Sequence, residues 1–100
     1  MAHSTPNQVI LPFYLPEQYP LLLETVDDIE LFDEKWEEWY QKHIQFKTEL
    51  KKNTGTQIHE IVVDVNELNE YCVMNGLKNT EATRMLFVNY LANLNKGIKL

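Results

Sequence analysis

Apolar and polar residues alternate over residues 57–64, which is the pattern of a β-strand buried on one face. The residues of the expected inner face are Ile61, Val63 and Val65, and those of the opposite face are Glu60, Val62 and Asp64. The main-chain groups of a strand need partners, yet no second segment shows an equally clear strand pattern. Two partners are open: a proline-containing arm near residues 9–14, and the same strand of a second copy of the chain.

A spacing of three and four residues between apolar side chains predicts one long amphipathic helix at about residues 28–53. Its apolar stripe consists of Ile29, Phe32, Trp36, Trp39, Tyr40, His43, Phe46 and Leu50. Acidic residues crowd its first half and lysines its last turns, an order that the helix dipole favours. Thr25 or Asp28 would cap the start, and Gly55 follows the end.

Two shorter helices are predicted after the strand, at about residues 65–75 and 80–95. Asp64, with Glu67 three residues later, is a start signal for the first, and Asn75-Gly76 is its stop signal. Asn79 or Thr80 would cap the second, which Gly97 follows. The residues expected to pack inward are Leu68, Tyr71 and Cys72, then Ala82, Met85, Leu86, Val88 or Asn89, and Leu91 to Leu94.

The first residues of the chain are small and polar, so residues 1–8 are predicted to be a flexible N-terminus and residues 9–100 a single small domain. Prolines at positions 12, 16 and 20 argue against a regular helix there, beyond a turn near residues 16–19. The expected fold class is α+β, with one long amphipathic helix, a small, about two-stranded β ribbon and two shorter C-terminal helices.

Charge is unevenly distributed in this chain of 100 residues, which carries a net charge of −6. Eight acids lie between Glu24 and Glu38, against the single base Lys35. This composition argues against nucleic acid as a partner and leaves a basic protein surface open. We therefore predict that a partner protein contacts an acidic face formed by Glu30, Glu34, Glu37 and Glu38.

The single cysteine, Cys72, cannot form an internal disulfide and suits a reducing compartment. The N-terminus lacks the pattern of a signal peptide, and no apolar run approaches the length of a membrane span. We therefore predict a cytoplasmic protein that does not interact with a membrane.

Several residues were weighed as candidates for chemistry. His59-Glu60 begins like a zinc-protease motif, but position 63, where the second histidine would stand, is valine. Cys72 lies between Tyr71 and Val73 at a position expected to be buried, and His43 lies on the apolar stripe. The sequence predicts no catalytic residue, no metal site and no cofactor.

Two further charged features have structural explanations. Glu37 and Glu38 stand beside two tryptophans, but adjacent helical residues point about 100° apart and cannot flank one glycosidic bond. Arg84, the only arginine, is expected to pair with Glu81 or Glu67 rather than with a substrate.

From Ile58 onward, the chain reads "IHEIVVDV", "NELNEYCVMNG" and "NTEATRMLFVNYLANL". This order of strand, helix, glycine and helix resembles the ribbon-helix-helix DNA-binding proteins. The resemblance implies a dimeric DNA-binding regulator over residues 57–95, whose strand pairs with that of a second copy. That family directs polar or basic side chains into the major groove, whereas the outward positions here would be Glu60, Val62 and Asp64, whose carboxylates the phosphates repel.

The function that the sequence favours is a small non-enzymatic module that interacts with another protein, or with its own copy as a homodimer, in an accessory or regulatory role. The DNA-binding regulator is the first alternative. The second is a small enzyme of unknown class, in which His43, His59, Cys72 or several carboxylates would gather in one pocket.

Overall fold

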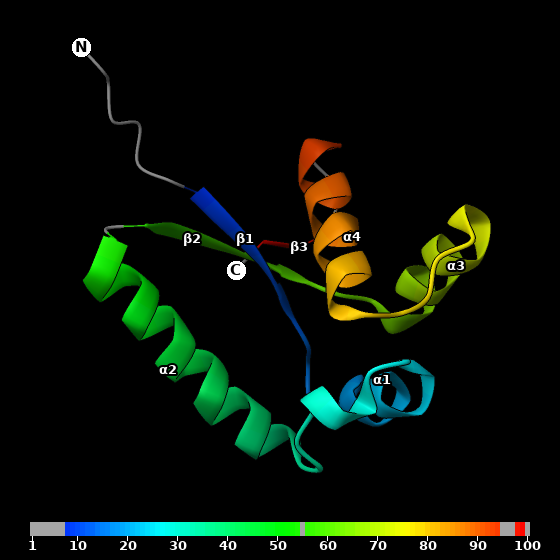
Figure 1. Cartoon of the computed structure of the whole chain (residues 1–100), viewed down its shortest axis with the longest axis horizontal. Coiled ribbons are helices and arrows are strands. Elements are labelled where there is room, and N and C mark those ends of the chain that lie inside the picture. Colours follow the sequence, from blue (N-terminus) through cyan, green and yellow to red (C-terminus); the bar gives the residue numbers. More distant parts are fainter. Residues whose placement is uncertain (1–7, 55, 95–97, 100) are drawn as a thin grey trace.

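The strand predicted from the alternating pattern is β2 (Gln57–Val62), and it has a neighbour on each side (Figure 1). β1 (Gln8–Phe13) pairs with it in parallel, with Gln8 opposite Gln57 and Phe13 opposite Val62. β3 (Ile98–Lys99) pairs in antiparallel orientation with Ile61 and Val62. The structure is a computed structural model that describes residues 8–54, 56–94 and 98–99.

Parallel strands cannot be joined by a tight turn, so the chain between β1 and β2 crosses over through helices. These are α1 (Tyr19–Thr25), the short 3₁₀ helix η1 (Ile29–Leu31) and α2 (Trp36–Thr54). After β2 come α3 (Val65–Asn75) and α4 (Glu81–Asn93). In Figure 1, α2 lies on one side of the paired strands and α4 on the other. The α+β fold with two C-terminal helices is confirmed.

The N-terminal arm supplies the partner of β2, which answers the pairing question within one chain. The carbonyl of Phe13 accepts a hydrogen bond from the amide of Val63 at 2.9 Å, so Phe13 directs its main-chain groups toward β2. The main-chain groups of successive residues point to opposite edges of a strand, so those of Pro12 point away from β2. Proline is tolerated there, because its missing N–H removes no hydrogen bond between β1 and β2. The predicted edge strand is therefore confirmed.

The core lies between β2, α1, α3 and α4. Ile61, Val63 and Val65 are almost fully buried, as the alternating pattern predicts. The other members of the buried cluster are Tyr14, Tyr19, Leu22, Leu68, Cys72, Phe87, Val88 and Leu91.

Local sequence signals set both ends of α3. The side chain of Asp64 accepts hydrogen bonds from the amides of Asn66 and Glu67, at 2.9 and 3.2 Å. Gly76 adopts the left-handed conformation, with φ 62° and ψ 34°, and the next amide, of Leu77, donates to the carbonyl of Cys72. The predicted cap and stop of this helix are both confirmed.

The prediction of one helix over residues 28–53 is wrong at its start. The backbone leaves the helical conformation at Asp28 and is extended at Phe32, so α2 begins only at Trp36. The reason is a long-range one: the Asp28 carboxylate is bound by Arg84 and by the amide of Glu81 on α4. As a result Ile29, predicted on the buried stripe, is exposed; Phe46 of α2 is exposed as well.

The prolines do not prevent a helix at residues 19–25, contrary to the prediction. Pro20 lies in the first turn of α1, where its missing N–H would have no helical acceptor. Thr25 is the last residue of this helix, and its hydroxyl donates to the carbonyl of Leu21 instead of capping a later helix.

The inward face predicted for α4 is correct at Val88 and Leu91 and wrong in its first half. Its buried residues are Thr83, Arg84, Phe87, Val88 and Leu91, whereas Ala82 and Leu86 are exposed. Arg84 pairs with Asp28, so the side of α4 that carries Arg84 faces the interior. Gln8, predicted in the flexible terminus, begins β1; residues 1–7, Gly55 and Gly97 lie outside the described residues.

Candidate functional site

The acidic face predicted to contact a partner comes from two successive elements. Glu30 belongs to η1, Glu34 precedes α2, and the first turn of α2 contains Glu37 and Glu38. All four side chains are exposed, and so are the apolar Ile29 and Leu31 of η1. The arrangement is thus a solvent-facing surface with acidic and apolar groups.

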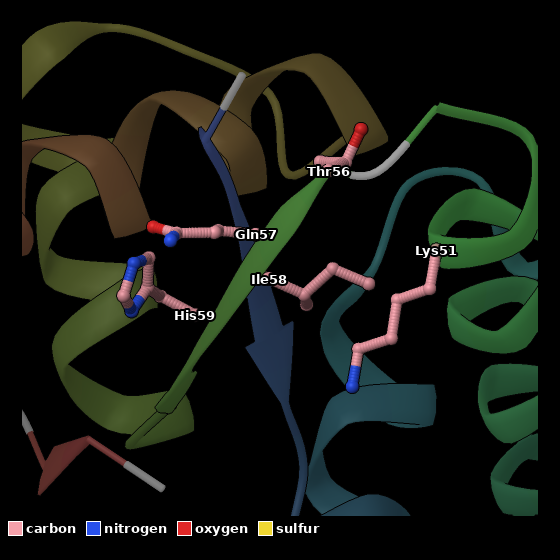
Figure 2. Close-up of a pocket in the computed structure, with 5 residues that line it drawn as sticks. All are labelled: Lys51, Thr56, Gln57, Ile58 and His59. Atoms are coloured by element: carbon pink, nitrogen blue, oxygen red, sulfur yellow. The ribbon is translucent and has the colours of Figure 1, made fainter. Parts of the chain in front are cut away.

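The structure places the candidates for catalysis, His43, His59 and Cys72, on three different elements, α2, β2 and α3. His59 lines an open cavity of about 570 Å³ together with Lys51, Thr56, Gln57 and Ile58. Figure 2 shows these five side chains. His43 and Cys72 are not among the residues that line the cavity, and His59 points to the opposite side of β2 from Ile58. Cys72 is buried on α3, and burial raises the pKa of its thiol, which disfavours the nucleophilic thiolate.

A polar cluster joins α2 to the outer face of β2. His43 lies 2.5 Å from one carboxylate oxygen of Glu60, measured from Nε2, and Lys47 donates to the other oxygen at 2.8 Å. The His43 ring stacks on Trp39, with ring centroids 4.7 Å apart. An ionised carboxylate only accepts hydrogen bonds, so Nε2 carries the hydrogen. The hydrogen bonds of this cluster therefore hold α2 against the sheet.

Partial burial raises the pKa of the Glu60 carboxyl, but the hydrogen bonds from Lys47 and His43 outweigh it and leave the pKa below its ordinary value. A carboxyl whose pKa is lower in the folded than in the unfolded protein stabilises the fold at pH values above its unfolded pKa, which is about 4.3 for glutamate. This stability is lost as the pH falls through the lower pKa of the folded state. Glu60→Gln should therefore cost about 1–2 kcal/mol at pH 7 and progressively less below about pH 4.

Chemical denaturation of the two proteins at several pH values measures this difference. Glu49→Gln, at an exposed position of α2, is the matched control and should change the free energy of unfolding little. A Glu60→Gln deficit that stays constant into strong acid would contradict the assignment.

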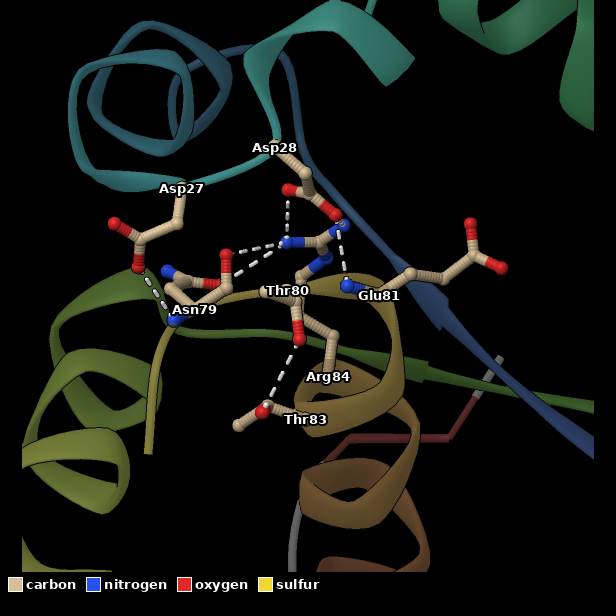
Figure 3. A network of polar contacts seen from close by, with 7 residues as sticks. All are labelled: Asp27, Asp28, Asn79, Thr80, Glu81, Thr83 and Arg84. Atoms are coloured by element: carbon tan, nitrogen blue, oxygen red, sulfur yellow. Dashed lines mark hydrogen bonds and ion pairs between the residues drawn. The ribbon is translucent and has the colours of Figure 1, made fainter. Parts of the chain in front are cut away.

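Arg84 organises a second, buried network, in which it pairs with Asp28 rather than with Glu81 or Glu67 as predicted (Figure 3). Its two terminal nitrogens each donate to one Asp28 oxygen at 2.8 Å, and Nη1 also reaches Asn79. The guanidinium lies 4.9 Å from the ring centroid of Phe32. Burial raises the pKa of the Asp28 carboxyl. Arg84 and the amide of Glu81 lower it by more than burial raises it, so the pKa lies below its ordinary value.

The backbone completes this connection. The amide of Asp27 donates to the carbonyl of Asn79 at 2.9 Å, and the amide of Asn79 donates to the Asp27 carboxylate at 2.7 Å. The loop before η1 is thereby fixed to the α3–α4 turn. The two terminal nitrogens of the buried Arg84 donate to Asp28 and Asn79, so this network determines how α4 is oriented.

The orientation of α4 leaves large apolar side chains outside the core. Leu86, Tyr90 and Leu94 follow one another at four-residue intervals and are 54%, 47% and 46% exposed. On α3, Met74 is 83% exposed. Side chains at this interval share one face of a helix, so α4 presents an apolar stripe to solvent.

Between α3 and α4 lies a groove of about 790 Å³, which we call the α3–α4 groove. Its lining residues are Glu67, Glu70, Tyr71, Met74, Asn75, Phe87, Tyr90 and Leu91. The Tyr71 ring lies 5.2 Å from the Phe87 ring and 5.4 Å from the Tyr90 ring, so three aromatic side chains meet where the helices approach. This surface was not predicted from the sequence, although α4 carries more apolar residues than one inward face can hold.

Comparison of the chain with protein-family profiles, curated proteins and solved structures finds no match. The ribbon-helix-helix resemblance holds for the order of β2, α3 and α4. However, β2 pairs along its whole length with β1 of the same chain, and Glu60 faces α2 instead of an open ribbon surface. No helix in the described ranges is sufficiently long and apolar to span a membrane.

Proposed function

We propose that this protein is a small non-enzymatic module of the cytoplasm that acts by binding another protein. The observation that carries the proposal is the α3–α4 groove, where Tyr71, Met74 and Tyr90 offer apolar surface to solvent beside the exposed stripe of α4. Exposed apolar surface of this kind on a small protein is typical of an interaction site. A single buried cysteine, Cys72, which forms no disulfide, is compatible with a reducing compartment.

A protein fits this groove better than a small molecule. Small-molecule sites enclose most of the ligand and place a few polar groups that converge on it. The groove is instead open to solvent, and its aromatic residues and methionine are the types enriched in protein interfaces. The acidic face of Glu30, Glu34, Glu37 and Glu38 is proposed as a second contact surface, supported by the exposed Ile29 and Leu31 beside it.

The proposal predicts that polar replacements in the groove reduce partner capture from a lysate of the native cells. Met74→Ser/Tyr90→Ser should lower the captured amount at least about 10-fold, since truncation of central apolar contacts commonly costs more than 1 kcal/mol each. Quantitative mass spectrometry of the proteins bound to each immobilised variant provides the measurement.

Phe46→Ser/Val73→Ser is the matched control, because both residues are exposed apolar positions outside the groove and outside the stripe of α4. A third variant with lysine at Glu30, Glu34, Glu37 and Glu38 tests the acidic face. Circular dichroism of every variant confirms folding. If the groove variant and the control retain the same bound proteins in equal amounts, the groove is not the binding site, and loss in the lysine variant alone would move the function to the acidic face.

A further inference from the structure

The α3–α4 groove combines apolar and acidic character. Glu67 and Glu70 lie three residues apart on α3, both line the groove, and no lysine or arginine does. Both acids are exposed, and neither forms an ion pair with another residue of the described ranges. An occupant that matches this surface must therefore place apolar side chains against Tyr71, Met74 and Tyr90 and cationic groups near the two carboxylates.

The walls of the groove select the conformation of the occupant. Backbone N–H and C=O groups inside α3 and α4 are already used in helical hydrogen bonds, so the walls offer no row of main-chain partners to an extended strand. A helix satisfies its own backbone and needs only apolar contacts on one face. The lining residues run from Glu67 to Asn75 on α3 and from Phe87 to Leu91 on α4, which gives walls of about 12 and 6 Å and contact with about two turns of a bound helix.

The same charges argue against a second copy in this groove. A symmetric dimer brings equivalent surfaces together, so Glu67 and Glu70 of one copy would approach those of the other. Since no lysine or arginine lines the groove, a symmetric dimer through it supplies no opposite charge, whereas a different protein with basic side chains does.

We infer that the groove binds a basic amphipathic helix of another protein, whose apolar side chains contact Tyr71, Met74 and Tyr90 and whose lysines or arginines pair with Glu67 and Glu70. This inference rests on the proposed function and specifies the chemistry of the partner.

The probe is a synthetic peptide of about three helical turns with leucines on one face and lysines on the other. Its affinity is measured by fluorescence anisotropy, and its position by amide chemical-shift changes in the full-length chain. We expect shifts at Met74 and Tyr90, and at least about 10-fold weaker binding of a peptide with glutamate in place of every lysine. A proline at the centre of the lysine peptide should abolish binding, because it breaks the helix.

Glu67→Gln/Glu70→Gln should weaken binding of the lysine peptide about 3- to 10-fold at low salt, and high salt should remove most of this difference. Glu24→Gln/Glu49→Gln, with the same change of charge at exposed positions outside the groove, is the matched control. Equal binding of the lysine, glutamate and proline peptides would overturn the inference, as would a groove-dependent dimer seen in the solution mass.

The two proposals fail in different ways. If Met74→Ser/Tyr90→Ser still lowers lysate capture but no helical peptide binds the groove, the inference on the partner is wrong and the proposed function stands. If these substitutions and the lysine variant of the acidic face all leave capture unchanged, the proposed function is wrong. Peptide shifts confined to the acidic face of η1 and α2 would also overturn the inference.

Discussion

Replacing Arg84 with methionine should lower the free energy of unfolding by about 3–5 kcal/mol, because it leaves the buried carboxylate of Asp28 without its charged partner. The substitution also removes the hydrogen bonds to Asn79 and the contact of the guanidinium with the Phe32 ring. Urea denaturation followed by circular dichroism measures the loss, with the slope checked for two-state behaviour.

Lys42→Met is the matched control, since it removes an ion pair with Asp33 by the same chemical change, at a lysine side chain that is mostly exposed. Its effect should be much smaller, because solvent screens exposed pairs. A double variant, Asp28→Leu/Arg84→Met, should be more stable than Arg84→Met alone, since it no longer buries an unpaired charge. If Arg84→Met and Lys42→Met destabilise equally, the network is not a main support of the fold.

The features that the sequence predicted correctly depend on residues close together in the chain. Asp64 caps α3 through amides two and three residues later, and Gly76 ends the helix because it can adopt positive φ. The alternation along β2 identifies Ile61 and Val63 as buried without knowledge of the partner strand. Each of these signals is complete within a few residues.

Two of the errors, the start of α2 and the inward face of α4, share one cause: the pair of Asp28 and Arg84, which are separated by 56 positions in the chain. This pair holds Asp28 outside a helix, so the apolar stripe of α2 starts later than its spacing suggested. It also turns Arg84 inward on α4, which exposes Leu86 and creates the surface proposed as the binding site. The spacing of apolar residues cannot predict such a pair, because an aspartate or an arginine considered alone is expected to be exposed to solvent.

The parallel orientation of β1 and β2 was within reach of the sequence. A long helix was predicted between the two candidate strands, and parallel strands require a connection of that kind. The groove was less accessible, because apolar residues at helical spacing were all assigned to one inward face. On α4 they occupy two faces, with Phe87 and Leu91 buried and Tyr90 exposed between them.

Leu22→Ala should cost about 2–5 kcal/mol of stability, although the proline-rich arm gave no sign of a helix there. Leu22 is fully buried on α1, so truncation removes apolar contact and leaves a cavity in the core shared with α3. Glu24→Ala, an exposed neighbour on the same helix, is the matched control and should change stability by less than about 0.5 kcal/mol. Denaturant titration of both variants measures the two losses, and similar small values would mean that α1 lies on the surface of the fold and does not help to form its core.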